Sequence, residues 1–88
     1  RRKKAEYIMA TQSAANAGLQ LLLAAHAEGL GSVWVCSPLF AQKTVQSVLD
    51  LPNFWEPQAM YFIGYPVEIP QPRERKDIME ISTFNVKR

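Results

Sequence analysis

The sequence predicts a layered fold in which helices combine with a small β-sheet. Two observations predict it: a long apolar helix over residues 13–30 leads directly into a strand, and a short helix leads into a second strand. The length of 88 residues allows one small domain. With 48% hydrophobic residues and a net charge of only +2, the chain has the composition of an ordinary soluble domain.

Residues 13–30, SAANAGLQLLLAAHAEGL, form the predicted central helix. Ala, Leu, Gln and Glu dominate this stretch and no proline interrupts it. Gly29 is expected to end the helix, because a residue without Cβ takes the left-handed conformation easily. Apolar side chains point in almost every direction around the axis, which is typical of a buried helix. The helix is too short and too interrupted to predict a membrane span.

A chain of this size can hardly cover such a helix on all sides, because it buries only roughly 60–65% of its unfolded surface. We therefore expect a partner: a second copy of the chain, a further part of the same protein, or both. The alanines and Gly18 permit close approach of two helices, which favours a dimer axis beside residues 13–30.

The N-terminal segment leaves two alternatives open. Residues 7–10 are apolar and extend the long helix backward, or Thr11 or Ser13 caps a separate helix start. Residues 1–4 are all basic. A solvated helix start or a processed boundary is favoured over a nucleic-acid arm, because no basic or aromatic residues continue the run. Without a signal-peptide pattern, and with one cysteine, the chain is expected in the cytoplasm.

Beyond Gly29 the pattern becomes extended. Residues 32–36 are β-branched, aromatic or small, as in a strand buried on both faces, and Pro38 ends that strand. Residues 41–49 carry apolar side chains at helical spacing and predict a short surface helix. Residues 59–63 predict a second buried strand. Two strands joined through a helix normally lie parallel, so a parallel pair is expected.

The remaining segments are predicted to cover surfaces. Residues 53–57 place Phe54 and Trp55 before Pro57, as in a loop over a core edge, and Trp34 and Trp55 are expected in the core. Residues 66–88 begin with a proline-rich stretch, which predicts an extended arm. Within residues 77–86 of this arm, three apolar side chains are expected to anchor it on the partner subunit: Ile78, Ile81 and Phe84.

Four segments in this order, LLLAAHAEGLGSVWV, VLDLP, WEPQAMYFIGYP and PRER, resemble the C-terminal half of the flavin-dependent nitroreductase family. The run GLGSVWVCSPLF with LDLPNFWEP is most similar to the flavin domain fused to bacterial ligases that glutamylate a deazaflavin cofactor. The resemblance covers residues 7–75. It implies an α+β, three-layer nitroreductase-like fold, of which residues 1–88 are the C-terminal portion. It also implies a homodimer with flavin mononucleotide (FMN) in each of two interface clefts.

The resemblance further implies that the segment after the first strand binds FMN. Cys36, Ser37, Pro38 and Leu39 would present backbone groups to the flavin ring. An N–H near the N5 or O4 edge of that ring favours the reduced, negatively charged flavin. The residues alone equally allow that Pro38 only ends a strand.

Arg73 and Arg75 match the basic pair that holds the FMN phosphate in this family. Two guanidinium groups two residues apart on an extended arm point the same way, and their planar donors suit a phosphate. Without the resemblance, a solvated charge pair with Glu74 and Asp77 is the favoured interpretation.

The function that the resemblance implies is an FMN-dependent oxidoreductase. Hydride would pass from NAD(P)H through the flavin to an electron-poor acceptor, such as a nitroaromatic or a quinone. No catalytic side chain is expected. Cys36 has no evident His partner, and His26 has no second ligand at helical spacing, so neither a nucleophile nor a metal site is predicted.

Two other functions stay open: a non-catalytic dimerisation or cofactor-holding module, and a reductase domain of deazaflavin cofactor biosynthesis. The family's N-terminal Arg-x-Ser/Thr-x-Arg phosphate motif is absent from these residues. We therefore expect a fragment of a longer enzyme or a short relative.

Overall fold

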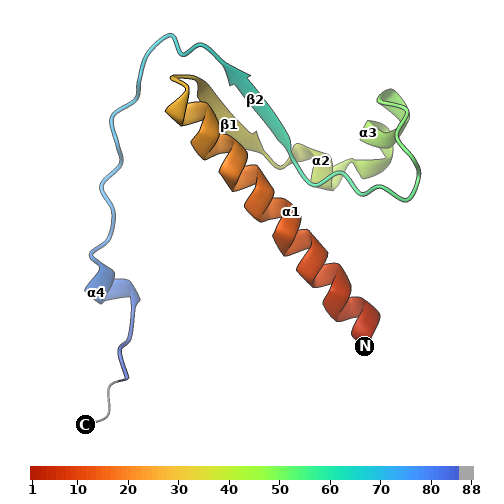
Figure 1. The fold of residues 1–88 in the computed structure, drawn as a ribbon, viewed down its shortest axis with the longest axis horizontal. Helices are drawn as coiled ribbons and strands as arrows, with labels where there is room; N and C mark the ends of the chain where they lie inside the picture. The colour runs from red at the N-terminus through yellow and green to blue at the C-terminus, as the bar shows by residue number, and fades with distance from the viewer. Residues whose placement is uncertain (86–88) are drawn as a thin grey trace.

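The computed structural model describes residues 1–85 and contains helices and one two-stranded sheet (Figure 1). The elements, in chain order, are α1 (Arg2–Ala27), β1 (Gly31–Val35), α2 (Ser37–Phe40), α3 (Gln42–Val48), β2 (Met60–Gly64) and α4 (Ile78–Ile81). The predicted mixture of helices and strands is confirmed, and each predicted strand lies within one residue of its expected position. The sequence analysis missed α2 and α4.

Helix α1 is one continuous element that includes the N-terminal segment. Thr11 lies inside it, because its hydroxyl donates to the carbonyl oxygen of Tyr7, four residues earlier, at 3.0 Å. A hydroxyl used in this way belongs to a helix interior and does not cap a start. The predicted stop is confirmed: the helix ends at Ala27, and Gly29 has φ +79°, in the left-handed region.

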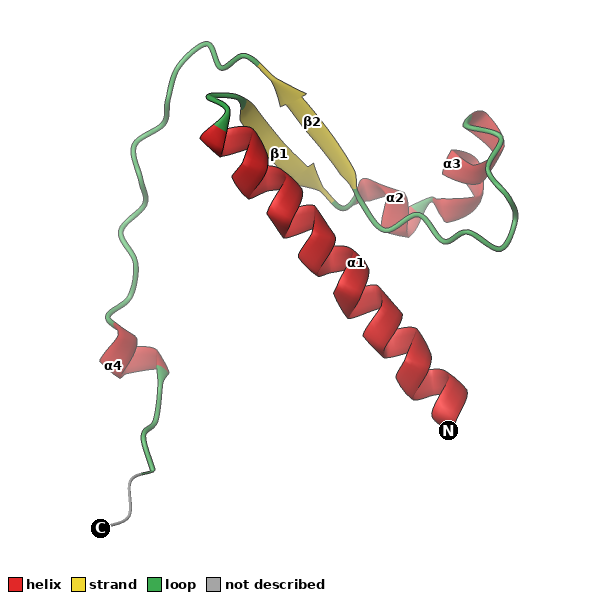
Figure 2. Cartoon of the chain, viewed as in Figure 1, coloured by secondary structure: helices red, strands yellow, loops and turns green. Residues whose placement is uncertain are grey.

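The two strands are antiparallel, so the predicted parallel pair is wrong. The register runs from Gly31 opposite Gly64 to Val35 opposite Met60. Helices α2 and α3 lie beyond the end of β1 and do not cross a face of the sheet (Figure 2). The connection therefore begins and ends at the same end of the sheet, so β1 and β2 form a hairpin with a long loop.

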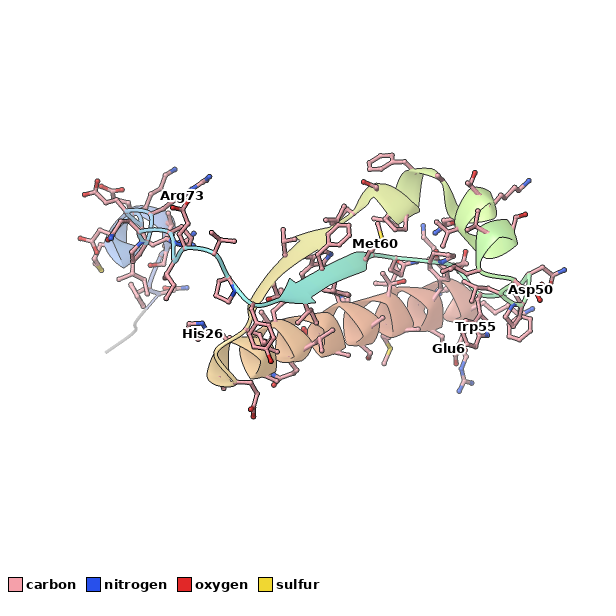
Figure 3. All side chains as sticks on the ribbon, turned by 90° about the horizontal axis from the view of Figure 1, so that it is seen from above. Glu6, His26, Asp50, Trp55, Met60 and Arg73 are labelled. Carbon is pink, nitrogen blue, oxygen red and sulfur yellow. The ribbon has the colours of Figure 1, made fainter. Side chains whose placement is uncertain are left out.

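Helix α1 covers one face of this hairpin (Figure 3). The Tyr61 side chain lies against α1 at Gly18, where an added Cβ would stand 2.7 Å from Cζ of the ring. Trp34 is the cross-strand neighbour of Tyr61, with ring centroids 5.7 Å apart. The next pair, Val33 and Phe62, is exposed on the opposite face. The described residues thus make two layers, and the third layer of the expected fold stays a prediction.

Little of the chain is buried. Within residues 1–85 the sole buried hydrophobic residue is Ala25, which is 6% exposed. Trp34 is 37% exposed and Trp55 is 52% exposed, so their assignment to the core is wrong for a single chain. Helix α1 buries only Gly18 and Ala25 and is not wrapped by its own chain. One helix on a two-stranded sheet has too little surface to cover these side chains. Cover by another protein surface stays a prediction.

Residues 66–77 contain no helix or strand and are extended, as predicted for the start of the arm over residues 66–88 (Figure 1). Tyr65, Val67 and Ile69 are 90%, 102% and 83% exposed, so these side chains gain little cover from their own chain, although Pro66 and Ile69 line a hollow beside Gly31. The radius of gyration is 17.9 Å, against roughly 12 Å for a compact domain of this length. The arm ends in the single turn of α4, where the Asp77 carboxylate accepts from the Met79 N–H at 3.3 Å. Val86, the last residue of the predicted anchor segment, lies outside the described residues.

Candidate functional site

The segment Cys36–Leu39 lies where β1 passes into α2. Cys36 precedes the helical turn, and its carbonyl oxygen accepts from the Leu39 N–H at 3.0 Å. Pro38 lies in the first turn, where a residue without an N–H is favoured, and it is the buried residue of this turn. Pro38 therefore both ends the strand and begins a tight turn. This turn holds Cys36, Ser37 and Leu39 exposed at the end of the hairpin.

The turn also limits which backbone donors can reach a ligand. Pro38 has no N–H, and the N–H of Leu39 is already used by Cys36. The N–H groups of Cys36 and Ser37 are the remaining donors of the four-residue segment. A ligand atom that accepts a hydrogen bond from this backbone would therefore bind the N–H of Cys36 or of Ser37.

A small apolar cavity lies beside this segment, between α1 and the hairpin. Its volume is about 180 Å³. The lining combines small helix residues with aromatic and aliphatic side chains, namely Thr11, Ala14, Ala15, Trp34, Cys36, Leu39, Gln58, Ala59 and Tyr61. An engineered apolar cavity of about 150 Å³ admits benzene. The cavity of a single chain thus has room for about one ring, which is less than the three-ring flavin needs.

Arg73 and Arg75 lie two residues apart on the extended arm, and both are exposed. Among residues 1–85 the structure has one ion pair, between Arg2 Nε and Glu6 Oε1 at 3.2 Å. Neither arm arginine is therefore paired with Glu74 or Asp77, as the charge-pair alternative would require. Arg75 shares a shallow surface hollow with the Glu74 and Asp77 carboxylates. These carboxylates would compete only weakly with a phosphate for the Arg75 guanidinium.

The structure does not bring the two groups of predicted site residues together in one chain. Cys36 follows Val35, which pairs with Met60 at the first residue of β2. The arm leaves from Gly64, at the far end of the same strand, and five residues of strand span about 17 Å. From there the arm continues away from the hairpin. In Figure 3, Arg73 accordingly lies at the left end of the molecule, well apart from Met60 near its middle.

The loop of residues 50–58, between α3 and β2, is held by side-chain hydrogen bonds that the sequence analysis missed. We call it the braced loop. Gln42 Nε2 donates to the carbonyl oxygen of Pro57 at 3.0 Å. Gln46, one turn later on the same face of α3, donates to the carbonyl oxygen of Trp55. The Tyr7 hydroxyl reaches Glu56 Oε1 at 3.4 Å. The sequence signal for this loop was the pair of glutamines four residues apart, which lie on one face of a helix. Their amide groups can donate hydrogen bonds to backbone carbonyl oxygens of a neighbouring segment.

The described part of the chain offers little other chemistry. No group of three or more His, Cys, Asp and Glu side chains in residues 1–85 could hold a metal ion. Cys36 is a free, exposed thiol. None of the helices in this range is both long enough and apolar enough to cross a membrane.

Two separate groups of these residues each suit a different part of FMN. The Cys36–Leu39 turn and its apolar cavity suit one edge of an aromatic ring that carries acceptor atoms. Arg73 and Arg75 suit a phosphate. Each group is exposed and available, and neither holds the whole cofactor by itself.

Comparison with known families gives an independent result. The sequence model described as the Nitroreductase family matches residues 1–65. The matched range contains α1, β1, α2, α3 and β2, together with the turn Cys36–Leu39. The arm with Arg73 and Arg75 lies beyond it.

Proposed function

Because the chain belongs to the nitroreductase family, which indicates an oxidoreductase-type function, we propose that it is the C-terminal part of an FMN-dependent oxidoreductase. Bound flavin would supply hydride transfer from NAD(P)H to an electron-poor acceptor, such as a nitroaromatic or a quinone. The observation that carries this proposal is the family match over residues 1–65, which includes the exposed turn at Cys36–Leu39. Members of this family generally bind flavin.

The residues of this chain are proposed to bind and orient the cofactor. The N–H groups of Cys36 and Ser37 would donate to acceptor atoms of the ring, and Leu39, which lines the cavity, would contact an apolar part of it. Arg73 and Arg75 hold the phosphate by paired, charge-assisted hydrogen bonds. Bound flavin supplies the hydride chemistry. No side chain of the chain has to act as a catalytic acid or base.

The proposal includes a cytoplasmic homodimer that forms through residues 13–30 and the arm. Two exposed surfaces support it. Leu19 is 46% exposed and Leu23 is 54% exposed on α1, although both are large and apolar. The arm carries three almost fully exposed apolar side chains before Pro70. Burial of such surface against a second copy would contribute about 25 cal/mol per Å².

The direct test is the visible spectrum of the purified protein. We expect a yellow protein with flavin absorbance that NADH or NADPH bleaches, and that a nitroaromatic or a quinone restores in a second step. A colourless protein that cannot be reconstituted with FMN would contradict the proposal. Titration with each nicotinamide separately identifies the donor.

Two alternatives make different predictions in the same assay. A reductase of deazaflavin cofactor biosynthesis would turn over a deazaflavin precursor and ignore nitro compounds; the similarity of GLGSVWVCSPLF to the ligase-fused domain favours it. A non-catalytic module would dimerise without reducing any acceptor. The single-ring size of the cavity favours that reading for one chain by itself.

A further inference from the structure

We propose that the hollow between α1 and the braced loop is a subsite for the electron acceptor, and that it binds a cationic substituent such as a protonated amine. The proposal rests on the proposed function and deepens it, because it names a chemical class of electron acceptor. Glu56 supplies the charge that recognises this substituent.

The hollow adjoins the apolar cavity beside the Cys36–Leu39 turn. Its volume is about 190 Å³, and its lining consists of Tyr7, Ala10, Thr11, Ala14, Glu56 and Gln58. Three of these residues, Thr11, Ala14 and Gln58, also line the apolar cavity. A molecule with one ring at the apolar cavity would therefore extend a substituent along α1 toward Glu56.

The polar groups of the hollow favour a cation. The Tyr7 hydroxyl already donates to Glu56 Oε1 at 3.4 Å, and the Gln58 side-chain amide donates to the Glu56 carbonyl oxygen at 3.0 Å. The Thr11 hydroxyl is used within its own helix. Within residues 1–85 the Glu56 carboxylate makes no ion pair and accepts no hydrogen bond at Oε2. A ligand would therefore meet a negative charge with a free oxygen, which favours a protonated amine over an anion.

The braced loop fixes the position of Glu56. The Gln46 side chain donates to the carbonyl oxygen of Trp55, the residue before Glu56. The Gln42 side chain donates to the carbonyl oxygen of Pro57, the residue after it. Figure 3 shows Trp55 at the N-terminal end of α1. Because the backbone on both sides of the carboxylate is tied to α3, less conformational freedom is lost when a cation binds.

Two nitroaromatic compounds of nearly equal size test the proposal on the purified full protein. One is para-nitrobenzylamine, which is a cation at neutral pH, and the other is para-nitrobenzyl alcohol, which is neutral. Their reduction by NADH or NADPH is measured by absorbance, and their binding is measured by NMR titration of the backbone amides. The amine should shift the amide signals of Thr11 and Gln58, which line the hollow.

Wild-type protein should prefer the amine about tenfold in kcat/KM, because a charge-assisted contact in an open hollow contributes at the low end of its range. The preference should lie in KM and not in kcat, since a contact away from the reacting atoms is the same in the ground state and the transition state.

The variant Glu56→Gln keeps the size of the side chain and removes its charge. The ratio of kcat/KM for the amine to kcat/KM for the alcohol should fall to about one, and the amine should bind about tenfold more weakly. Glu28→Gln removes the same charge at the other end of α1 and is the matched control, in which the ratio should not change. A partly unfolded variant does not alter the ratio, because both compounds are compared in the same protein. An unchanged ratio in Glu56→Gln would overturn the proposal.

The two measurements separate failure of this proposal from failure of the proposed function. A protein that binds the amine through Glu56 but reduces neither compound would contradict the proposed function and support the cation subsite. A protein that reduces both compounds equally well, whether or not Glu56 is replaced, would support the proposed function and overturn the cation subsite.

Discussion

Two regions of the chain differ in how far their side chains contact the rest of the molecule. One is the helix–hairpin unit, made of α1, β1 and β2, and the other is the arm, described over residues 66–85. In the helix–hairpin unit, Tyr61 fits against Gly18, Ala25 is buried and all five residue pairs of the two strands are in register. In the arm, Val67 is fully exposed and Ile69 is 83% exposed. The helix–hairpin unit is thus specified by its own contacts, whereas the arm side chains Val67 and Ile69 gain little cover from the rest of the chain. Substitutions in the two regions should therefore change different measurements.

The largest effect is expected from the arm arginines. Replacing Arg73 and Arg75 with alanine should weaken FMN binding at least roughly 100-fold, because each charge-assisted hydrogen bond contributes about 1.5–3 kcal/mol. The unfolding temperature without FMN should not change. Isothermal titration of the apoprotein with FMN measures the affinity, and Lys76→Ala is the matched control in the same exposed segment. An unchanged affinity in the double variant would remove the phosphate assignment.

The next effect lies in the helix–hairpin unit. Gly18→Ala should lower the free energy of unfolding by about 1–2 kcal/mol, since a Cβ there would overlap the Tyr61 hydroxyl and stand 2.7 Å from Cζ. This net loss remains after the roughly 1 kcal/mol that alanine gains over glycine in a helix is subtracted from an overpacking cost of about 2–3 kcal/mol. Urea unfolding followed by circular dichroism measures it. Gly64→Ala, where nothing lies within 4 Å of an added Cβ, serves as the control. Equal stability of both variants would contradict the close contact.

A smaller effect is expected at the end of α1. Gly29 has φ +79°, and an alanine in that conformation costs about 1 kcal/mol. Gly29→Asn should cost less, because asparagine tolerates the left-handed region better. The same unfolding experiment ranks the two variants. If Gly29→Ala is as stable as Gly29→Asn or more stable, then the turn between α1 and β1 does not need a left-handed residue at this position.

The smallest effect concerns the braced loop. Gln42→Ala removes the bond to the Pro57 carbonyl and should cost about 0.5–1 kcal/mol. Its main consequence should be faster amide hydrogen exchange in residues 50–58, measured by mass spectrometry. Gln12→Ala on α1, for which the structure describes no side-chain bond, is the control. Unchanged exchange in the Gln42 variant would show that the loop holds its shape without this brace.

Local signals predicted the elements well. Gly29 predicted the end of the long helix, and the proline-rich stretch from Pro66 predicted an extended segment. Strand direction was not predictable in the same way. The rule that favours parallel strands applies when a connection crosses the sheet, and spacing alone does not show that α2 and α3 stay beyond its end.

The candidate site could be predicted only as separate pieces. The Cys36–Leu39 turn and the Arg73 and Arg75 pair followed from resemblance, and family membership over residues 1–65 supports only the range that holds the turn. The apolar cavity at Leu39 depends on how Ala14 and Tyr61 pack, which no sequence pattern encodes. Burial of Trp34 was predicted wrongly, because hydrophobicity shows that a side chain needs cover and not which chain supplies it.

The central proposal is that this chain belongs to an FMN-dependent oxidoreductase that works as a homodimer, and native mass spectrometry of the purified full protein tests it most directly. We predict one species with the mass of two chains and two FMN molecules. Loss of the dimer on dilution should release both cofactors, without a monomer that carries FMN. A single chain that retains one FMN in the gas phase and in solution would contradict the account.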